Sequence, residues 1–245
     1  MGALLSAGYG LIVYAFFLAT FLYAIGFVGN FAVPKSIDAG MASPPLQAVA
    51  IDVLLLGVFA LQHSVMARRG FKAWWTRMVP QAVERSTYVL AATLALALLC
   101  WQWRPIAVPV IWRIDNAAAV GAVRGVFWLG WVILLFSTFL INHFELFGLR
   151  QVFARVSNSE QPAPQFRTPM LYRYVRHPIY LGFLLGFWAT PVMTAGHLLL
   201  AAGTTGYILV GIWFEERDLV HQFGDQYRRY RDQVGMLLPS RKRTN

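Results

Sequence analysis

Cysteine and charge are both scarce in this chain. Only one of its 245 residues, Cys100, is a cysteine, which excludes a disulfide-stapled scaffold and a cysteine-rich zinc site. Charged residues make up 13%, against roughly 25% in soluble globular domains. The sequence also lacks GxGxxG, P-loop, HExxH and GxSxG patterns, so soluble nucleotide-binding and hydrolase chemistries have no support.

The chain is rich in hydrophobic residues. They make up 58% of the chain, and the mean hydropathy is +0.52. This composition excludes a disordered chain and an ordinary soluble domain. It predicts a single integral-membrane domain over residues 1–245.

The net charge of +10 does not indicate a nucleic-acid partner. A protein that binds nucleic acid gathers its basic residues on one folded face. Here they lie in short groups between long apolar runs, which is typical of a membrane topology.

The apolar runs predict an all-α, polytopic fold with about six transmembrane helices. About 20 apolar residues cross the roughly 30 Å of hydrocarbon in a bilayer. The first four predicted spans are 8–31, 45–66, 86–103 and 122–144. Residues 178–214 are uncharged and about twice the needed length, with Pro191, Gly196 and His197 at the middle, so they predict two helices in a tight hairpin.

Basic residues predict the orientation of these six spans, because cytoplasmic loops carry an excess of lysine and arginine. Three segments that six spans place on one side hold 17 of the 21 basic residues. Only Lys35, Arg104, Arg113 and Arg124 lie on the other side. Both termini are therefore predicted to be cytoplasmic, in a bacterial inner membrane.

Two segments have the pattern of helices at the membrane surface. Residues 68–85 interleave Phe71, Trp74 and Trp75 with basic residues, as expected at the headgroup level. Residues 215–234 place apolar side chains at helical spacing opposite a polar face. We expect both segments to form cytoplasmic interfacial helices.

Ionisable residues near membrane spans are costly and are therefore candidates for a functional site. The predicted topology places nine polar residues at the cytoplasmic ends of helices: His63, Asn142, His143, Glu145, Arg176, His177, Tyr180, Glu215 and Glu216. Their convergence predicts an active site that opens to the cytosol. As an alternative, His63 and His143 could ligate a haem in a non-enzymatic haem- or quinone-associated membrane subunit.

The last third of the chain carries a specific signature. It consists of RHPIYLG from Arg176, EERDL from Glu215 and FGDQYRRY from Phe223, and it ends at Pro239. This pattern resembles the isoprenylcysteine carboxyl methyltransferase superfamily, whose members are helical membrane enzymes that use S-adenosylmethionine. The resemblance implies that residues 172–239 form the cofactor-binding region, with no metal.

The resemblance also implies the residues that bind the cofactor. They are His177, Tyr180, Gly182, Glu215 and Glu216, together with Arg176 and Tyr227. Glu215 or Glu216 suits the amino group or the ribose hydroxyls of S-adenosylmethionine, and Arg176 suits its carboxylate.

Three further segments narrow the range of possible substrates. GNFAVPKSIDAG (29–40), LQHSVMAR (61–68) and INHFELFGLRQV (141–152) resemble the bacterial branch of this superfamily that methylates small thiols. The implied partner is a small thiol, methanethiol or hydrogen sulfide, in a lipid bilayer. The alternative acceptor is a prenylcysteine carboxylate or a phospholipid amine. Ile212, Trp213 and Phe214 precede the acidic pair where the prenylcysteine branch has basic residues, which weakens that alternative.

A thiol acceptor must lose a proton, because the thiolate attacks far better than the thiol. His143 is the predicted proton acceptor, with Glu145 or His63 as its orienting or relay partner. Asn142 is expected to hydrogen-bond the thiolate. The oligomeric state has no signal in the sequence.

Overall fold

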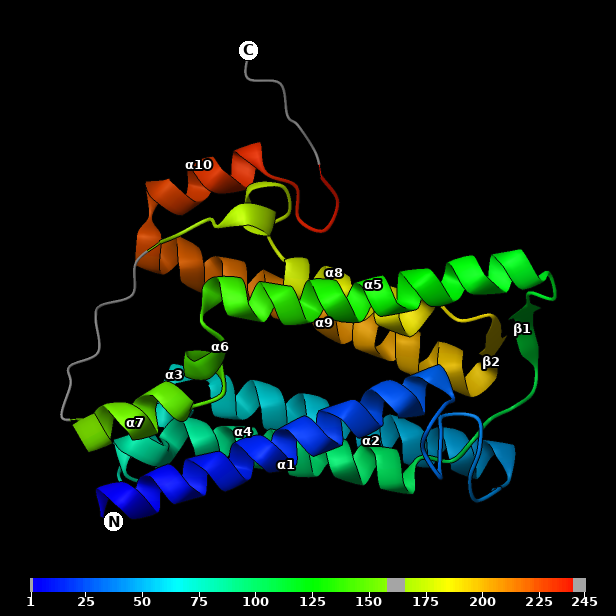
Figure 1. The fold of residues 1–245 in the computed structure, drawn as a ribbon, viewed down its shortest axis with the longest axis horizontal. Helices are drawn as coiled ribbons and strands as arrows, with labels where there is room; N and C mark the ends of the chain where they lie inside the picture. The colour runs from blue at the N-terminus through cyan, green and yellow to red at the C-terminus, as the bar shows by residue number, and fades with distance from the viewer. Residues whose placement is uncertain (1, 158–165, 240–245) are drawn as a thin grey trace. The chain divides into compact units, whose positions relative to one another are not determined.

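Long helices make up most of the computed structural model, which describes residues 2–157 and 166–239 (Figure 1). The elements are α1 (Ala3–Gly29), α2 (Pro45–Ala67), α3 (Arg69–Trp75), α4 (Gln81–Gln102), β1 (Val110–Arg113), α5 (Ala117–Ile141), α6 (His143–Leu146), α7 (Leu149–Ser157), the 3-10 helix η1 (Met170–Arg173), α8 (Pro178–Trp188), β2 (Val192–Thr194), α9 (Ala195–Phe223) and α10 (Asp225–Gln233). The two strands form a two-stranded sheet.

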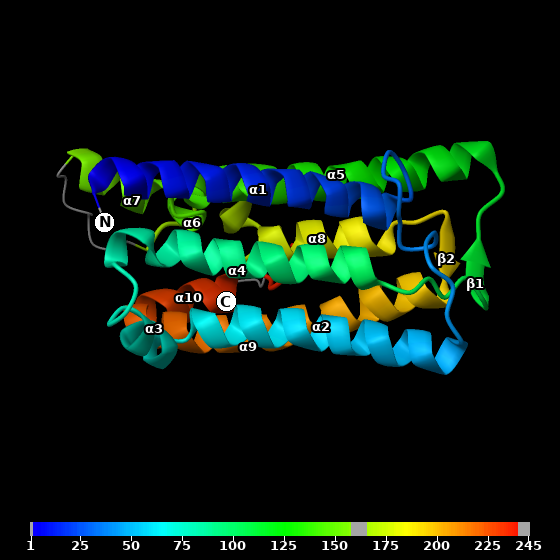
Figure 2. The same ribbon diagram turned by 90° about the horizontal axis from the view of Figure 1, so that it is seen from below.

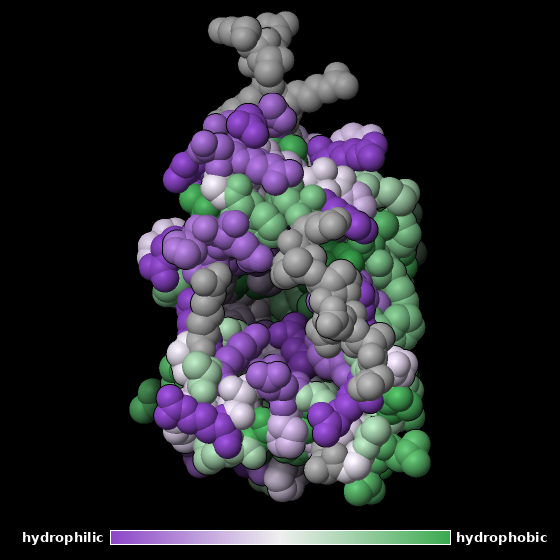
Figure 3. All heavy atoms as spheres, turned by 90° about the vertical axis from the view of Figure 1, so that its left-hand side faces the viewer, coloured by the Kyte–Doolittle hydropathy of each residue, from purple (hydrophilic) through white to green (hydrophobic). Residues whose placement is uncertain are grey.

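Within the described residues, five helices are long and apolar enough to cross a membrane: α1, α2, α4, α5 and α9. The shortest of them has 22 residues, which corresponds to about 33 Å at 1.5 Å per residue. The first four predicted spans are thus confirmed, with ends that differ by a few residues. On the face shown in Figure 3, hydrophilic side chains lie in several groups, and hydrophobic side chains are most frequent along one edge.

The hairpin is present, but its first arm is short. α8 has eleven residues and covers only about 16 Å, too little for a full helical crossing. The helix ends at Trp188, and an extended segment with Pro191 leads through β2 to α9. Trp188 Nε1 donates a hydrogen bond to Thr205 Oγ1 at 2.9 Å, and Tyr180 Oη donates to Glu215 Oε2 at 3.0 Å. These contacts confirm antiparallel arms.

The chain divides into two compact units. Unit 1 holds residues 2–111, 142–157 and 193–199, and unit 2 holds 112–141, 166–192 and 200–239. In unit 1, α1 and α2 both pack along α4 (Figures 1 and 2). Val13, Tyr88 and Val89 form a buried cluster there, against which Phe17, Phe147 and other side chains pack.

Gly148 joins α6 to α7 in unit 1. Its φ is +84°, a left-handed conformation that favours glycine. A Cβ at this position would lie 2.8 Å from the backbone nitrogen of Ser86 in α4. Glycine therefore allows the sharp turn and also the close approach to α4.

In unit 2, the main helix contact is between α5 and α8, and small residues make it possible. A Cβ at Gly182 would lie 2.6 Å from the carbonyl oxygen of Gly130 and 2.8 Å from the backbone nitrogen of Leu134. A Cβ at Gly130 would likewise lie 2.7 Å from the carbonyl oxygen of Gly182. The two backbones thus touch where both side chains are missing.

Gly182→Ala is expected to lower the stability of the detergent-solubilised protein by about 1–3 kcal/mol, because the methyl group overpacks a backbone contact. Gly206→Ala in α9 is the matched control, since a Cβ there meets nothing within 4 Å. That control should be neutral or slightly stabilising. Thermal unfolding checks both variants, and equal melting temperatures would contradict the packing role of Gly182.

The two surface helices differ from the prediction in their bounds. In segment 68–85, the helix α3 ends at Trp75, and α4 begins at Gln81 after Pro80. The predicted helix 215–234 is two helices, because α9 continues to Phe223 and Gly224 adopts a φ of +55° before α10. Glycine tolerates this conformation, so a single helix through Gly224 was wrong. The basic residues Arg241, Lys242 and Arg243 lie outside the described residues.

Candidate functional site

The start of α8 and the segment after α10 lie side by side in unit 2. Val175 and Gly235 form a parallel bridge, and the backbone nitrogens of Arg176 and His177 donate to the carbonyl oxygens of Gly235 and Met236 at 2.9 and 3.1 Å. This pairing joins two parts of the signature that are about 60 residues apart in the chain. It fixes the backbone from which Arg176 and His177 extend toward α9.

Glu216, near the end of α9, is the centre of a polar cluster. Its Oε1 accepts hydrogen bonds from Arg176 Nε at 2.8 Å and from His177 Nε2 at 3.0 Å. The three side chains are 14%, 10% and 4% exposed, in the order Glu216, Arg176 and His177. A carboxylate with so little exposed surface is stable when it is paired and hydrogen-bonded, and both conditions are met here.

Arg176 is also hydrogen-bonded to the segment at the end of α10. Its Nη1 donates to the carbonyl oxygens of Arg231, at 2.9 Å, and of Val234. One guanidinium thus connects α9, the end of α10 and the start of α8. In this arrangement its donors serve the protein itself, whereas the sequence predicted a contact with the cofactor carboxylate.

Glu215 is the accessible member of the acidic pair. Its side chain is 45% exposed, and its Oε2 accepts from Tyr180 Oη at 3.0 Å and lies 3.8 Å from His177 Nδ1. An exposed carboxylate held by a tyrosine can accept hydrogen bonds from an ammonium group or from hydroxyl groups of a ligand. The acidic pair therefore divides into a buried anchor, Glu216, and an exposed acceptor, Glu215.

Three tyrosines surround this cluster. Tyr227 is buried, and Tyr230 Oη donates to the carbonyl oxygen of Tyr172. Burial raises the pKa of Tyr230 to about 12 and also raises the pKa of Tyr227 and Tyr172. Their hydroxyl groups are therefore neutral donors at ordinary pH. The sequence reasoning missed Tyr172, which lies four residues before the RHP motif and has no distinguishing pattern of its own.

Gly182 does not belong to this polar cluster. Its missing side chain faces Gly130 and Leu134 of α5, as described above. The structure therefore brings together Arg176, His177, Tyr180, Glu215, Glu216 and Tyr227 of the predicted cofactor residues, while Gly182 supports the helix from which Tyr180 extends.

In unit 1, Asn142 and Glu145 form a local network at the start of α6. Asn142 Oδ1 accepts from the backbone nitrogen of Glu145, which caps the helix, and its Nδ2 donates to Glu145 Oε2 at 2.7 Å. Arg150 Nη1 donates to the same carboxylate oxygen at 2.8 Å. Both polar groups of Asn142 thus have partners on its own loop.

His143 points in another direction and pairs with a residue that the sequence did not single out. Its Nε2 lies 2.8 Å from Tyr14 Oη in α1, and the imidazole is only 6% exposed. Burial lowers the pKa of His143 below its ordinary value, so the ring is neutral at pH 7 and able to accept a proton. Tyr14 is 129 residues away along the chain, so no spacing rule could find this pair.

His63 occupies a separate aromatic environment in α2. Its ring stacks on Phe59 with centroids 5.5 Å apart and lies 5.2 Å from the ring of Tyr88. Tyr88 Oη donates to the backbone carbonyl of His63 at 3.3 Å. These contacts hold the second helix against α4 at the level of His63.

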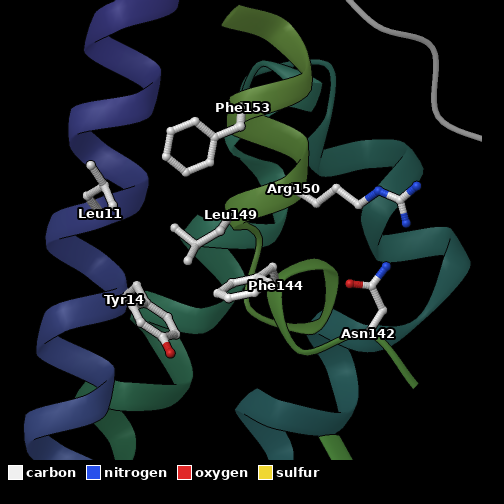
Figure 4. Close-up of a pocket in the computed structure, with 7 residues that line it drawn as sticks. All are labelled: Leu11, Tyr14, Asn142, Phe144, Leu149, Arg150 and Phe153. Carbon is white, nitrogen blue, oxygen red and sulfur yellow. The ribbon is translucent and has the colours of Figure 1, made fainter. Parts of the chain in front are cut away.

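A pocket of about 690 Å³ opens beside α1 and α7 in unit 1 (Figure 4). Its apolar lining consists of Leu11, Phe144, Leu149 and Phe153, and its polar lining of Tyr14, Asn142 and Arg150. Leu11, Phe144 and Phe153 are 48%, 53% and 46% exposed. In a protein with membrane-spanning helices, such exposed apolar side chains are ones that lipid can contact.

Relatives of known name resemble this chain over nearly its whole length. The methanethiol S-methyltransferase of Mycobacterium tuberculosis is 58% identical over 231 residues, which are 94% of each chain. Methanethiol S-methyltransferase 1 of Bradyrhizobium diazoefficiens is 55% identical over 96% of this chain and 82% of its own. Nurim of Danio rerio is 30% identical over 71% of this chain and 66% of its own.

No family model and no solved structure matches the chain. The identity to the bacterial enzymes is nevertheless far above the level at which a shared family is in question, and it covers both units described here. It confirms the resemblance predicted from the signature segments. The chain belongs to the methanethiol S-methyltransferase family.

Proposed function

We propose that this protein transfers a methyl group from S-adenosylmethionine to methanethiol and so forms dimethyl sulfide. The observation that carries the proposal is the 58% identity, over 94% of both chains, to a methanethiol S-methyltransferase. Hydrogen sulfide is a second acceptor of the same chemistry. The identity favours this reading over a prenylcysteine or phospholipid acceptor, and over a haem- or quinone-associated subunit.

The polar cluster of unit 2 has hydrogen-bonding groups of the kinds that S-adenosylmethionine needs for binding. S-adenosylmethionine supplies a methyl group on a positively charged sulfur. Glu215 is an accessible acceptor for its amino and hydroxyl groups, and the Tyr180 hydroxyl, whose proton is donated to Glu215, can accept a further hydrogen bond. Arg176, His177 and Glu216 form the buried frame, Tyr227 packs beside it, and residues 172–239 are the cofactor-binding region of a single methyltransferase domain.

The pair of His143 and Tyr14 carries the proton chemistry in this proposal. A neutral imidazole accepts the thiol proton, either directly or through the Tyr14 hydroxyl at 2.8 Å. Glu145, Asn142 and Arg150 hold the loop on which His143 lies. His63, with Tyr88, supports the same unit from α2.

The orientation in the membrane is also part of the proposal. In this proposal α8 and the extended segment after it count together as one crossing. On this count 17 of the 21 basic residues lie in three segments on one side, so both termini and the active site face the cytosol. Arg217, whose guanidinium lies 5.4 Å from the Trp213 ring, marks the headgroup level at the end of α9.

Membranes that contain the expressed protein test the function directly. With S-adenosylmethionine and methanethiol added, headspace gas chromatography is expected to detect dimethyl sulfide that requires both additions. Membranes from the same host without the gene are the control. A lack of dimethyl sulfide, in membranes that still bind radiolabelled S-adenosylmethionine, would discard the thiol and direct the search to lipid-borne acceptors.

A further inference from the structure

Tyr172 lies near the acidic pair of unit 2, and the hydrogen bonds of the polar cluster do not use its hydroxyl proton. The residue belongs to η1. Its side chain is half-buried, and its hydroxyl group has no hydrogen-bond partner among residues 2–157 and 166–239. Burial, and to a lesser extent the Glu215 carboxylate, raises the pKa of Tyr172, so the hydroxyl keeps its proton. Tyr172 is therefore a neutral donor near an exposed carboxylate.

Hydrogen bonds of the backbone hold Tyr172 in place. Its carbonyl oxygen accepts from Tyr230 Oη in α10, and its nitrogen donates to the carbonyl oxygen of Pro169 at 2.9 Å. The Val175 nitrogen donates to the Leu171 carbonyl oxygen at 3.0 Å. A donor that is already held in place loses little conformational entropy when a ligand binds. A contact made by this hydroxyl should therefore contribute most of its strength to affinity.

The methyl donor of the proposed function ends in an amino-acid group. In S-adenosylmethionine an ammonium and a carboxylate are attached to the same carbon atom, so a site that binds this group needs an acceptor and a donor close together. Glu215 is the exposed acceptor. Arg176 is poorly suited to be the donor, because its Nε and Nη1 bond to Glu216 and to the backbone and its side chain is only 10% exposed.

Tyr172 is the tyrosine of this cluster whose proton is left for a ligand. Tyr180 donates its proton to Glu215, and Tyr230 donates to the backbone of Tyr172. Tyr227 is only 2% exposed, so a ligand has little access to it. A phenol hydroxyl forms its strongest hydrogen bonds with charged acceptors, and the carboxylate is the charged acceptor of the methyl donor.

We propose, building on the proposed function, that the Tyr172 hydroxyl donates a hydrogen bond to the carboxylate of S-adenosylmethionine while Glu215 accepts one from its ammonium group. The two residues, both in unit 2, then recognise the amino-acid end of the methyl donor as a pair. Tyr172 is thus a further cofactor-binding residue. Because its contact is with the carboxylate and not with the transferred methyl group, loss of the hydroxyl should lower the affinity for the methyl donor.

Binding of two ligands to the purified protein tests the proposal. Isothermal titration measures the Kd for S-adenosylmethionine and for its decarboxylated form, which keeps the ammonium group and lacks only the carboxylate. The unmodified protein should bind the decarboxylated form at least about tenfold more weakly, because a hydrogen bond to a charged group is lost. Tyr172→Phe should raise the Kd for S-adenosylmethionine by a similar factor and leave the Kd for the decarboxylated form within about twofold of its original value.

Tyr174→Phe is the matched control, because it removes the same hydroxyl from a nearby side chain that is 66% exposed. It should leave both Kd values unchanged. Glu215→Gln should weaken the binding of both ligands alike, since each carries the ammonium group. Tyr172→Phe keeps the aromatic ring, so thermal unfolding should give it the melting temperature of the unmodified protein.

Each other outcome contradicts a defined part of the inference. Equal affinity of the unmodified protein for the two ligands would mean that nothing binds the carboxylate. An equal loss of affinity for both ligands in Tyr172→Phe would mean that the hydroxyl contacts another part of the methyl donor. If Tyr172→Phe kept the full preference for S-adenosylmethionine, the carboxylate partner would be another donor, such as the exposed Arg173. Failure of the unmodified, folded protein to bind either ligand would overturn the proposed function as well.

Discussion

Glu216→Gln is expected to lower methyl transfer by at least about 100-fold and to destabilise unit 2. The substitution removes the charge that balances Arg176 and leaves a guanidinium that is only 10% exposed without a counter-ion. Breaking a buried ion pair from one side typically costs about 3–5 kcal/mol. Headspace assays and thermal unfolding measure these two losses, and binding of labelled S-adenosylmethionine is expected to weaken with them.

Two companion variants separate the role of Glu216 from a general effect of lost charge. Asp225→Asn breaks the exposed pair with Arg228, in which both side chains are more than half exposed, and should change stability by less than about 1 kcal/mol. Glu215→Gln should weaken binding of S-adenosylmethionine and leave the melting temperature nearly unchanged, because Glu215 is 45% exposed. Full activity in Glu216→Gln would contradict the anchoring role.

The spans could be predicted from the sequence because their signal is local. A run of about 20 apolar residues has few alternatives to a transmembrane helix, and α1, α2, α4 and α5 follow that rule. The short α8 could not be predicted from hydropathy, since residues 178–214 are uncharged throughout and mostly apolar. Its end depends on where the chain must turn near Pro191, and hydropathy does not report that position.

The bend at Gly224 shows a similar limit. The apolar spacing from Leu219 to Val234 fits one helix, and a glycine inside a helical pattern is often tolerated. The bonds of Arg176 to the carbonyl oxygens of Arg231 and Val234 hold the segment after Gly224 against the start of α8. Such long-range contacts decide the backbone at Gly224, and the sequence does not encode them in any short window.

The candidate site, too, could be predicted only in part from the sequence. The RHPIYLG and EE motifs carry enough information to name Arg176, His177, Glu215 and Glu216 together, and the structure places all four within one hydrogen-bonded cluster. The motifs do not say which glutamate is buried. Only the three-dimensional arrangement distinguishes the anchor from the exposed acceptor.

His143→Gln is expected to lower kcat/KM for methanethiol about 100-fold at pH 7, because positioned general bases typically contribute 10²–10⁴-fold. Burial lowers the pKa of His143 below 6.5, so the neutral, proton-accepting ring persists as the pH falls through 6.5. In the unmodified protein, the fall of kcat/KM on the acid side of the pH profile should therefore lie below pH 6.5. In the variant the thiol must ionise unaided, so its kcat/KM should rise with pH as the thiolate fraction grows.

The pH profile distinguishes a base from a residue that only packs. If His143 accepts the proton, the deficit of His143→Gln shrinks steadily from pH 7 to pH 9, because the small thiolate fraction of the acceptor rises about tenfold with each pH unit in that range. If the ring only supports Tyr14 and Phe147, the deficit stays constant across the same range. His221→Gln, at an exposed position near the end of α9, makes the same chemical change and should leave the whole profile unaltered. A constant deficit would show that His143 is not the proton acceptor and that the thiolate forms in solution before it binds.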